Sequence, residues 1–544
     1  MSLNPSTPGW HLGRQRTINE VFRATLERCP ERRFLNFLDG DVWTYREFDQ
    51  ACNELAHGLQ ALGVGKETTV AGFLENRVEV LLTWFAAMRL GGIYVPVNPA
   101  FKGDFLRHQL EDSCAAAVVA EPDLVKQFAP IASGLTHLRV VLHRGTLASA
   151  PPLPFAVKPL REVLVAGRER IEAPSLPSDI TALLYTGGTT GPSKGCMIPH
   201  NAMVDLAHFT VEHDARTEHD VAWTCLPFTH SNALGLTVLA QMLVGGTAAV
   251  SRRFSVSTFW DDVEKAGATI AGGLATMMKF LADAPDSPAM LRYQGKLRVM
   301  RGAPFPPELR RRWRERFGVE QVGSNVYGLT EALLLCTLPR GAEAPPGSSG
   351  RRNANFDVRI VNDRDEELPP GEAGEIICRP LRPNLMFKGY WNRPADTLRV
   401  WDNLWFHTGD VGKFDAQGFF YYVDRKKDCV RRRGESISSY DVETAFLKHP
   451  DVAEIAAHAV SSVNGEDDLK ITVVRRAGSA VSEEQLARWS IERVPYFAVP
   501  RYIEFRDELP RSELGRIRKV ELREQGCTPA TWDFEESGIK LAKR

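Results

Sequence analysis

Apolar residues switch repeatedly between helical spacing and short continuous runs in the first part of the chain. Residues 45–65 carry apolar side chains at helical spacing and end in glycines, and residues 68–76 follow as a short apolar run. Residues 77–92 and 93–99 repeat this order, with the helical spacing stopped by a Gly-Gly pair. Such alternation predicts parallel sheets covered by helices, an α/β fold class.

The pattern changes after about residue 345. Residues 345–380 contain short β-rich runs between Pro, Gly and Asp turns, which predicts a β-rich subdomain with hairpins. A run rich in Lys and Arg then ends at Gly434, and a helix is expected to begin near Ser439. We therefore expect a large N-terminal domain over residues 1–426 and a small, mobile α+β C-terminal domain over residues 427–544.

One long apolar stretch resembles a membrane span at first sight. Residues 221–251 contain no Asp, Glu, Lys or Arg. Pro227, His230 and a Gly-Gly pair interrupt the stretch, so a buried helix followed by a strand is favoured, and we expect no stable membrane insertion. The first residues of the sequence contain no apolar core of signal-peptide length, so secretion is not expected.

The composition is that of a globular protein large enough for several domains. The chain has 544 residues, of which 43% are hydrophobic and 25% charged, which excludes wholesale disorder and a coiled-coil rod. The 67 basic and 68 acidic residues nearly cancel, so no overall field attracts nucleic acid, and we expect no nucleic-acid partner. The nine cysteines include no Cys-x-x-Cys pair, which favours a reducing, cytoplasmic location. A homodimer is an open possibility.

The most informative stretch is "ITALLYTGGTTGPSKGCMIPHNAMV", residues 180–204. An apolar strand runs into a loop rich in Gly and Thr, and Lys194 follows the loop. Glycines let backbone N–H groups turn toward phosphate oxygens, threonine hydroxyls add donors, and the lysine adds a positive charge. The spacing matches neither Walker A nor Gly-x-Gly-x-x-Gly. A phosphate-binding loop is favoured over a flexible surface loop.

The loop resembles that of the adenylate-forming superfamily, which includes acyl- and aryl-CoA synthetases, luciferases and peptide-synthetase adenylation domains. The usual loop reads Tyr-Thr-Ser-Gly-Thr-Thr-Gly-x-Pro-Lys-Gly, and "YTGGTTGPSKG" matches it with Gly187 in place of the serine. Seven further motifs follow in order: "LPFTHSNAL" (226–234), "RGAPFP" (301–306), "NVYGLTEA" (325–332), "GEAGEIICRP" (371–380), "LWFHTGDVG" (404–412), "DRKKDCVRRRGESISSYDVE" (424–443) and "LPRSELGRIRK" (509–519). Within the superfamily, "RRRGESISSYDVE" is most similar to carnitine/crotonobetaine-type and related bacterial acyl-CoA ligases.

The resemblance implies an ATP-dependent acid–CoA ligase that works in two steps. A carboxylic acid and ATP give an acyl adenylate and pyrophosphate, and the acyl group then passes to the thiol of CoA with release of AMP. ATP, Mg²⁺ and CoA are the expected cofactors and co-substrates. The small domain is expected to rotate between the two steps.

The matching positions imply an ATP site with Mg²⁺. Thr330 matches the hydroxyl that donates to the α-phosphate, and Asp410 matches the carboxylate that accepts both ribose hydroxyls, which suits an acceptor-only group. Glu331 and Thr189 match the metal positions, and carboxylate oxygen is the hard ligand that Mg²⁺ prefers. The expected ATP-binding residues are Thr186, Gly187, Gly188, Thr189, Thr190, Gly191, Gly302, Ala303, Pro304, Tyr327, Gly328, Asp410 and Arg425.

Catalytic and CoA-binding positions are implied in the same way. The expected catalytic residues are Lys194, Thr330, Glu331 and Arg516, with Lys427 as the hinge. The segment "RRRGES", with Arg433, Gly434 and Glu435, is expected to line the tunnel for the pantetheine arm of CoA. Family members usually carry Gly-Lys in the last motif, whereas this chain has Gly515 and Arg516. We expect Arg516 to replace the lysine, although arginine is longer and planar, and Lys519 is the alternative.

The substrate is the least determined part of the site. The expected acid pocket consists of His230, Ser231, Asn232, Ala275 and Arg301. This set is more polar than a fatty-acid channel needs, which favours a short, functionalised or aromatic acid. If Arg301 faces inward, it can pair with a second carboxylate or a carbonyl of the substrate. Two alternatives stay open, an adenylating enzyme with another acceptor and a nucleotide-binding pseudoenzyme.

Overall fold

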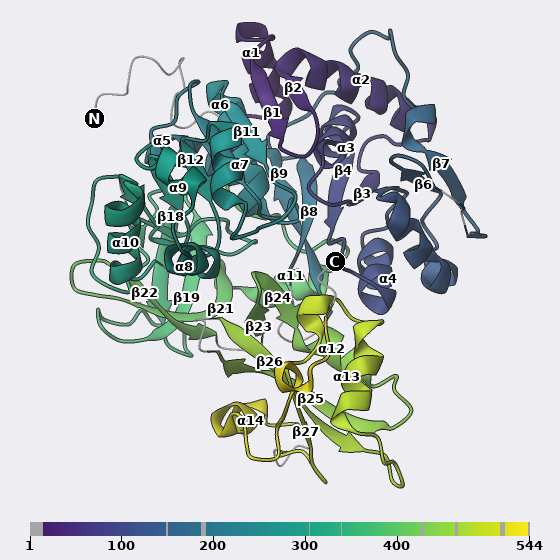
Figure 1. Cartoon of the computed structure of the whole chain (residues 1–544), viewed down its shortest axis with the longest axis vertical. Helices are drawn as coiled ribbons and strands as arrows, with labels where there is room; N and C mark the ends of the chain where they lie inside the picture. Colours follow the sequence, from purple (N-terminus) through teal and green to yellow (C-terminus); the bar gives the residue numbers. More distant parts are fainter. Residues whose placement is uncertain are drawn as a thin grey trace.

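A computed structural model of the chain describes residues 15–541 apart from residues 148, 150, 187–191, 304, 339, 426–428, 463–465 and 512–516, and gives no side chains for residues 424, 425, 429 and 436. Figure 1 shows a large body, drawn from purple to green, above a smaller domain drawn from yellow-green to yellow. The α/β fold class expected from the sequence is confirmed, since both large sheets consist mainly of parallel strands and helices cover them.

The first large sheet belongs to the amino-terminal part of the body. Its neighbouring strands run parallel except for the last pair, which forms an antiparallel ladder. In spatial order the strands are β7 (Ala156–Pro159), β6 (Val140–His143), β5 (Ala117–Ala120), β3 (Thr69–Phe73), β4 (Ile93–Val97), β8 (Ile180–Thr186) and β9 (Lys194–Pro199). The central strands are buried along their whole length, as expected of parallel strands covered on both faces.

The second large sheet contains strands from distant parts of the sequence. All its neighbouring pairs run parallel except β1 with β2. In spatial order the strands are β14 (Gln321–Val322), β13 (Val299–Arg301), β12 (Ile270–Gly272), β10 (Val221–Thr224), β11 (Thr247–Val250), β1 (Arg33–Phe37) and β2 (Val42–Thr44).

Helices form three layers around the two sheets. One core joins α1, α2, α3, α5, η3 and α6 to both sheets, a second places α7 to α10 on the other face of the second sheet, and a third places α4 and η1 on the far face of the first. The helices are α1 (Ile18–Arg28), α2 (Tyr45–Ala61), α3 (Val78–Arg89), α4 (Gly103–Asp112), η1 (Pro122–Gly134), η2 (Leu160–Glu162), α5 (His200–Asp214), η3 (Asn232–Leu239), α6 (Ala240–Val244), α7 (Phe259–Ala266), α8 (Ala275–Asp283), α9 (Pro288–Tyr293), α10 (Pro307–Phe317) and α11 (Pro394–Val400).

Local sequence explains where the first helices begin and end. Thr17 with Glu20, and Thr44 with Glu47, form capping boxes that satisfy backbone N–H groups at the starts of α1 and α2. The predicted stop after α3 is confirmed, because Gly91 takes a φ of 70° directly after the helix. The apolar stretch 221–251 contains the predicted helix and strand, namely η3 with α6 and then β11, and also begins with the strand β10.

Antiparallel strands follow the second sheet, as the change of pattern near residue 345 predicts. A three-stranded sheet and a five-stranded sheet, whose fifth strand pairs with β21, pack beside the body. These strands are β15 (Val326–Tyr327), β16 (Cys336–Thr337), β17 (Arg351–Arg352), β18 (Phe356–Val361), β19 (Gly374–Pro380), β20 (Trp401–Asp402), β21 (Trp405–Phe414) and β22 (Phe420–Arg425).

The smaller domain is built on a four-stranded sheet and the hairpin of β23 with β24, and its hydrophobic core also includes Ala100 and Phe105 of the body. The helix expected near Ser439 is present as α12. The elements are β23 (Cys429–Arg432), β24 (Glu435–Ser438), α12 (Ser439–Phe446), β25 (Val452–Ser461), β26 (Asp467–Arg475), α13 (Glu483–Ile491), η4 (Tyr496–Ala498), β27 (Tyr502–Phe505), α14 (Lys519–Gln525), β28 (Trp532–Asp533) and η5 (Phe534–Ser537).

Candidate active site

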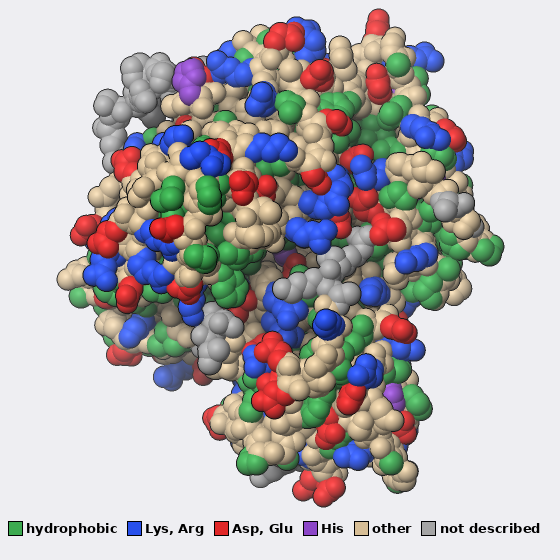
Figure 2. Space-filling view, in the orientation of Figure 1, with side chains coloured by type: hydrophobic (Ala, Val, Ile, Leu, Met, Phe, Trp, Pro, Cys, Tyr) green, Lys and Arg blue, Asp and Glu red, His purple; other side chains and the backbone are tan. Residues whose placement is uncertain are grey.

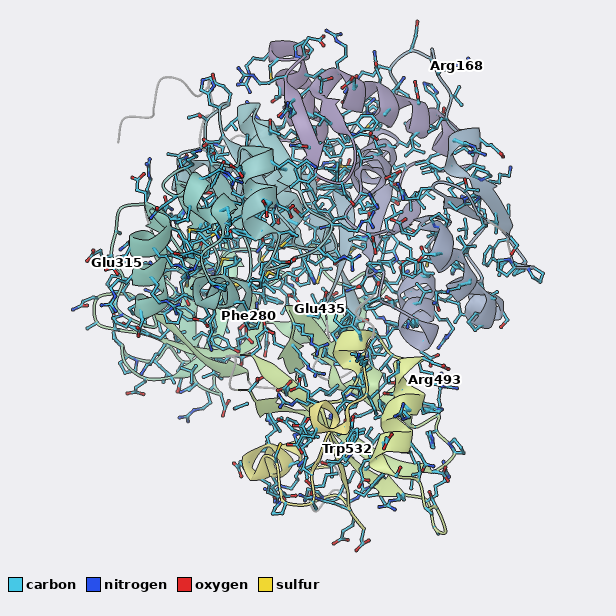
Figure 3. All side chains as sticks on the ribbon, viewed as in Figure 1. Arg168, Phe280, Glu315, Glu435, Arg493 and Trp532 are labelled. Atoms are coloured by element: carbon cyan, nitrogen blue, oxygen red, sulfur yellow. The ribbon has the colours of Figure 1, made fainter. Side chains whose placement is uncertain are left out.

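A cavity of about 1370 Å³ lies where the carboxyl ends of strands from both large sheets meet the smaller domain. Its wall includes residues within two positions of the ends of β3, β4, β10, β11 and β12, which is where open α/β sheets bind ligands. The hairpin of β23 and β24 supplies the opposite wall. Figure 2 shows Lys and Arg side chains gathered in the middle of this face, and Figure 3 shows Glu435 and Phe280 beside the junction with the smaller domain.

The hairpin of β8 and β9 brings two expected ATP-binding residues together. Thr186 ends β8 and pairs in the ladder with Lys194, the first residue of β9, and both line the cavity. The Lys194 Nζ lies 3.8 Å from a carboxylate oxygen of Asp396 and 5.1 Å from the ring centre of Tyr390. The loop residues Gly187, Gly188, Thr189, Thr190 and Gly191 lie outside the described residues.

Glu331 lies at the same end of the cavity, together with Gly328 and Thr330. Its Oε1 accepts a hydrogen bond of 2.9 Å from the Tyr390 hydroxyl, and burial together with the Glu331 charge holds the pKa of Tyr390 well above its ordinary value. Tyr390 therefore remains a neutral donor that fixes the carboxylate. In the part of the chain that the structure describes, no cluster of three or more His, Cys, Asp or Glu forms a metal cage.

Asp410 lies on β21 in the cavity wall and is oriented by an aromatic neighbour. The Tyr327 hydroxyl donates to Asp410 Oδ2 at 2.8 Å, and burial and then the Asp410 charge raise the pKa of Tyr327 well above its ordinary value. The Tyr327 ring stacks on Tyr422, with 6.0 Å between ring centres. The Asp410 carboxylate suits the hydroxyls of a ribose, and Tyr327 orients it without being part of the cavity wall.

The remaining expected ATP residues fall into three groups. Gly302 and Ala303 follow β13 directly, yet they are not part of the cavity wall, and a Cβ on Gly302 would lie 3.0 Å from the Phe305 ring. Pro304 lies outside the described residues. The backbone of Arg425 pairs with Asp410 in the ladder of β21 and β22, but its side chain is not described.

The expected acid pocket is only partly assembled. His230, Ser231 and Asn232 line the cavity at the start of η3. Ala275, the first residue of α8, does not line it, although its neighbours Leu274, Thr276 and Met277 do.

Arg301 already has a partner within the protein. It is buried at the end of β13, is not part of the cavity wall as described, and its Nη1 donates to Asp214 Oδ1 at 2.6 Å. The sequence analysis considered only a group of the substrate as the partner of an inward-facing Arg301. In the structure, one end of its guanidinium is paired with the Asp214 carboxylate.

The hairpin of β23 and β24 carries the expected CoA-binding residues into the cavity. Arg433 and Gly434 form its two-residue turn with φ of 55° and 80°, the conformation of a type I′ turn. Glu435 connects the hairpin to the body, because its Oε2 lies 3.0 Å from His230 Nε2 and its Oε1 accepts a hydrogen bond of 2.9 Å from Asn98.

The neighbouring arginines differ in role. Arg432 is buried, lies 3.2 Å from Asp468 and donates to the carbonyl of Val499 at 2.6 Å. The guanidinium of Arg432 is therefore paired inside the smaller domain. Arg431 and Arg433 line the cavity, and the guanidinium of Arg433 lies 5.7 Å from the ring centre of Tyr496.

Two expected catalytic residues, Lys427 and Arg516, lie outside the described residues. The alternative to Arg516 can be examined. Lys519 Nζ lies 2.6 Å from Glu443 and donates to Ser439 Oγ at 3.0 Å, so both its partners belong to α12 of the smaller domain. Because the Lys519 ammonium is already paired within the smaller domain, Arg516 is the favoured candidate for the catalytic cation.

Sequence reasoning missed two polar residues of the cavity. Asn98 follows β4 and Tyr390 follows the β-rich segment, and both contact residues expected in the site. The signal for Asn98 was available, because a polar residue at the carboxyl end of a predicted parallel strand lies at the ligand edge of the sheet. Tyr390 carries no comparable signal, since 59 residues separate it from Glu331.

Curated relatives extend over almost the whole chain. A feruloyl-CoA synthase from Amycolatopsis is 33% identical, covering 89% of this chain and 94% of the relative. A crotonobetaine/carnitine–CoA ligase from Escherichia coli is 30% identical, covering 88% and 93%. A long-chain-fatty-acid–CoA ligase from Escherichia coli is 29% identical, covering 94% and 95%.

Solved structures share the fold. ATP-bound MatB from Rhodopseudomonas palustris superposes with a TM-score of 0.66 at 25% identity, covering 94% of this chain and 99% of that one. The o-succinylbenzoate CoA synthetase MenE from Bacillus subtilis, bound with a product analogue, has a TM-score of 0.77 at 24% identity, covering 93% and 98%. None of the described helices is long and apolar enough to cross a membrane.

Family models match both parts of the chain. The model of the AMP-binding enzymes covers residues 22–391, and that of the AMP-binding enzyme C-terminal domain covers residues 441–516. The chain therefore belongs to the AMP-binding, adenylate-forming enzyme family and is an ATP-dependent, AMP-forming acyl-CoA synthetase.

Proposed function

We propose that this ligase activates a short, polar or aromatic carboxylic acid and transfers it to CoA. The observation that carries this proposal is the polar cluster His230, Ser231 and Asn232 in the cavity wall, where a channel for a long alkyl chain would need apolar side chains. Leu274 and Met277 face the same cavity and provide apolar surface for the body of such an acid. The feruloyl-CoA synthase relative supports an aromatic acid.

The first step joins the acid to AMP. A carboxylate oxygen of the acid forms a bond to the α-phosphorus of ATP, the bond from that phosphorus to the bridging oxygen breaks, and pyrophosphate leaves. Lys194, Thr186 and Thr330 offset charge on the phosphates, and Asp410 holds the ribose. Arg516, in the last motif, is proposed to bridge the carboxylate and the α-phosphate in place of the usual lysine.

Mg²⁺ fits this site as a companion of ATP. Mg²⁺ is usually held by one or two carboxylates together with phosphate oxygens and water. Glu331, fixed by the Tyr390 hydroxyl, supplies one such carboxylate. The described residues contain no group of three or more His, Cys, Asp or Glu that could hold a metal ion. When bound, Mg²⁺ would offset negative charge on the triphosphate.

The second step moves the acyl group to CoA. The thiol sulfur attacks the acyl carbon, and the bond from that carbon to the AMP oxygen breaks. Arg433, Gly434 and Glu435 are proposed to line the path of the pantetheine arm, and Gly434, which has no side chain, lets the hairpin backbone pack closely against Leu274. Lys427 is proposed as the hinge between a domain of residues 1–426 and one of residues 427–544.

Arginines at the mouth of the cavity are proposed to bind the phosphates of CoA. Arg253 and Arg431 line the cavity, and neither side chain has an ion-pair partner among the described residues.

A cytoplasmic location is supported by the free thiols of all cysteines whose side chains are described. A homodimer is proposed only as an assembly to be tested by sedimentation.

A panel of acids tests the substrate class. The purified enzyme is given ATP, Mg²⁺ and one acid at a time, with and without CoA, and pyrophosphate and thioester are measured. Short polar acids and hydroxylated aromatic acids are expected to have the highest kcat/KM. A clear preference for fatty acids of 12 or more carbons, roughly the length that needs an apolar channel, would overturn the proposal.

A further inference from the structure

Arg301 stands at the ligand edge of the second sheet. It is the last residue of β13, and its partner in the neighbouring strand β12 is Gly272. One pair earlier on the same face, Val299 and Ile270 form a small apolar cluster with Ala222. Side chains two residues apart on a strand share a face, so Arg301 and Gly272 both point to the side of that cluster.

The guanidinium of Arg301 is held at one end only. Nη1 donates to Asp214 Oδ1 at 2.6 Å, and the Asp214 side chain is fully buried. The Nε and Nη2 groups have no hydrogen-bond acceptor among the described residues. These two groups form one edge of the planar guanidinium, the fork that binds a carboxylate with two parallel hydrogen bonds.

Asp214 does not neutralise its surroundings. It also accepts hydrogen bonds from Arg216 Nε at 3.0 Å and Nη2 at 2.8 Å, so one buried carboxylate serves two buried arginines. Nη1 of Arg216 is buried without a hydrogen-bond partner among the described residues. The adjacent pair of Arg298 with Asp220 is balanced, with contacts of 2.9 Å. A surplus positive charge therefore remains beside Arg301, and a buried charge is costly unless it is paired.

Open space lies beside Gly272, the neighbour of Arg301 in the sheet. A Cβ placed on Gly272 would meet no heavy atom within 4 Å, and Gly272 is partly exposed although the rest of β12 is buried or nearly so. Leu274, two residues after Gly272, lines the cavity, as does Cys225 directly after β10. The strand ends around Arg301 thus lead into the proposed acid site.

We propose that Arg301 is a specificity-determining residue whose Nε and Nη2 edge binds a second carboxylate, at the far end of the acid from the carboxylate that is adenylated. The substrate class is then short dicarboxylic acids, aliphatic or aromatic. This inference rests on the proposed function, because it concerns the acid site of the ligase. Asp214 acts as the positioning residue that holds the other end of the guanidinium.

Matched pairs of acids test the inference without any substitution. The probes are glutarate against pentanoate and terephthalate against benzoate, which differ in the distal carboxylate. The ratio of kcat/KM for the two members of a pair is expected to favour the dicarboxylate by about 10²-fold, because a buried charged pair loses on the order of that factor when one partner is removed. Equal or reversed preference in both pairs would overturn the inference.

Substitutions of Arg301 test whether this residue causes the preference for dicarboxylates. Arg301→Gln is expected to lower the ratio about 10²-fold, and Arg301→Lys, which keeps the charge near Asp214 but not the fork, about tenfold. Arg298→Gln is the matched control, since it also removes an arginine from an ion pair of this sheet but at the amino end of β13, and it should leave the ratio unchanged.

The outcomes separate the two proposals. If Arg301→Gln does not fold, Arg301→Lys and the wild-type ratios still decide. Equal ratios in the Arg301 and Arg298 variants would overturn the role of Arg301 while leaving the substrate class of short polar or aromatic acids intact. Turnover of long fatty acids alone would overturn the proposed function and this inference with it.

Discussion

Two regions deliver side chains to the same cavity, but they hold them differently. The body positions Thr186, Lys194 and Asp410 on strands whose ladders continue into a large core. Within the described residues, the hairpin of β23 and β24 forms a separate two-stranded sheet. It contacts the body through Glu435 with His230 and Asn98, and through the packing of Gly434 on Leu274. We propose that the body holds the phosphates of ATP, whereas the hairpin can be withdrawn from the cavity together with the smaller domain. We infer that the body serves adenylation and the hairpin serves transfer to CoA.

The largest effect is expected from removing the Glu331 carboxylate, the proposed Mg²⁺ ligand in the body. Glu331→Ala should lower acyl-adenylate formation by a factor of about 10³ or more, because the carboxylate that Tyr390 fixes for Mg²⁺ is lost. Pyrophosphate release measures the effect. Asp402→Ala, which removes an exposed carboxylate from the same cavity, is the control and should change the rate little. Near-normal adenylation by a folded Glu331→Ala protein would remove Glu331 from the ATP site.

A second substitution concerns the catalytic cation of the last motif. Arg516→Ala should slow adenylation by about 10²-fold, the scale on which loss of one transition-state donor falls, and Arg516→Lys should keep activity. Lys519→Ala is the matched control, because Lys519 already pairs with Glu443 in the smaller domain. The assay is single-turnover formation of the adenylate. A loss confined to Lys519→Ala would move the catalytic role three residues along the chain.

A third substitution tests how the packing of the hairpin against the body affects thioester formation. Gly434→Ala should slow thioester formation about tenfold and adenylation less, because the added Cβ lies 2.6 Å from Leu274 Cδ1 in a residue with φ of 80°. Gly478→Ala, at a nearly identical φ of 82° with no neighbour within 4 Å, carries the same backbone strain without the contact. The rate of thioester formation from a supplied acyl adenylate is measured in both variants and distinguishes the contact from the strain. Identical effects would show that strain alone, rather than hairpin packing, is responsible.

The smallest expected effect is a pH dependence of hairpin docking. Desolvation opposes protonation of His230, but the Glu435 carboxylate outweighs it and raises the pKa of His230 above 6.5. The contribution of this pair is therefore complete below the ordinary pKa of histidine and disappears as the pH rises through the raised value. Rates of acyl transfer between pH 5.5 and 8.5, around the ordinary histidine pKa of about 6.5, are expected to fall at the high end. Glu435→Gln should flatten this profile, and an unchanged profile would contradict the pairing.

The parts of the fold that follow from local rules could be predicted. Apolar spacing and glycine stops indicated α2, β3, α3 and β4 because helix and strand periods are properties of short segments. The start of α12 at Ser439 was equally visible.

Long-range charge pairing could not be predicted from the sequence. Arg301 and Asp214 lie 87 positions apart, and 36 positions separate Arg432 from Asp468, so only the folded topology makes them partners. The same applies to the hairpin of β23 and β24. Its turn places Arg433, a non-glycine residue, at a positive φ, which no sequence rule favours.

The division of labour between body and hairpin is tested most directly by one rapid-quench experiment. Adenylate formation from ATP, and transfer of a supplied acyl adenylate to CoA, are measured in the wild type, Glu331→Ala and Gly434→Ala. The account predicts that Glu331→Ala loses the first rate but keeps the second, and that Gly434→Ala retains most of the first and is slow in the second. Loss of the same step in both variants would contradict it.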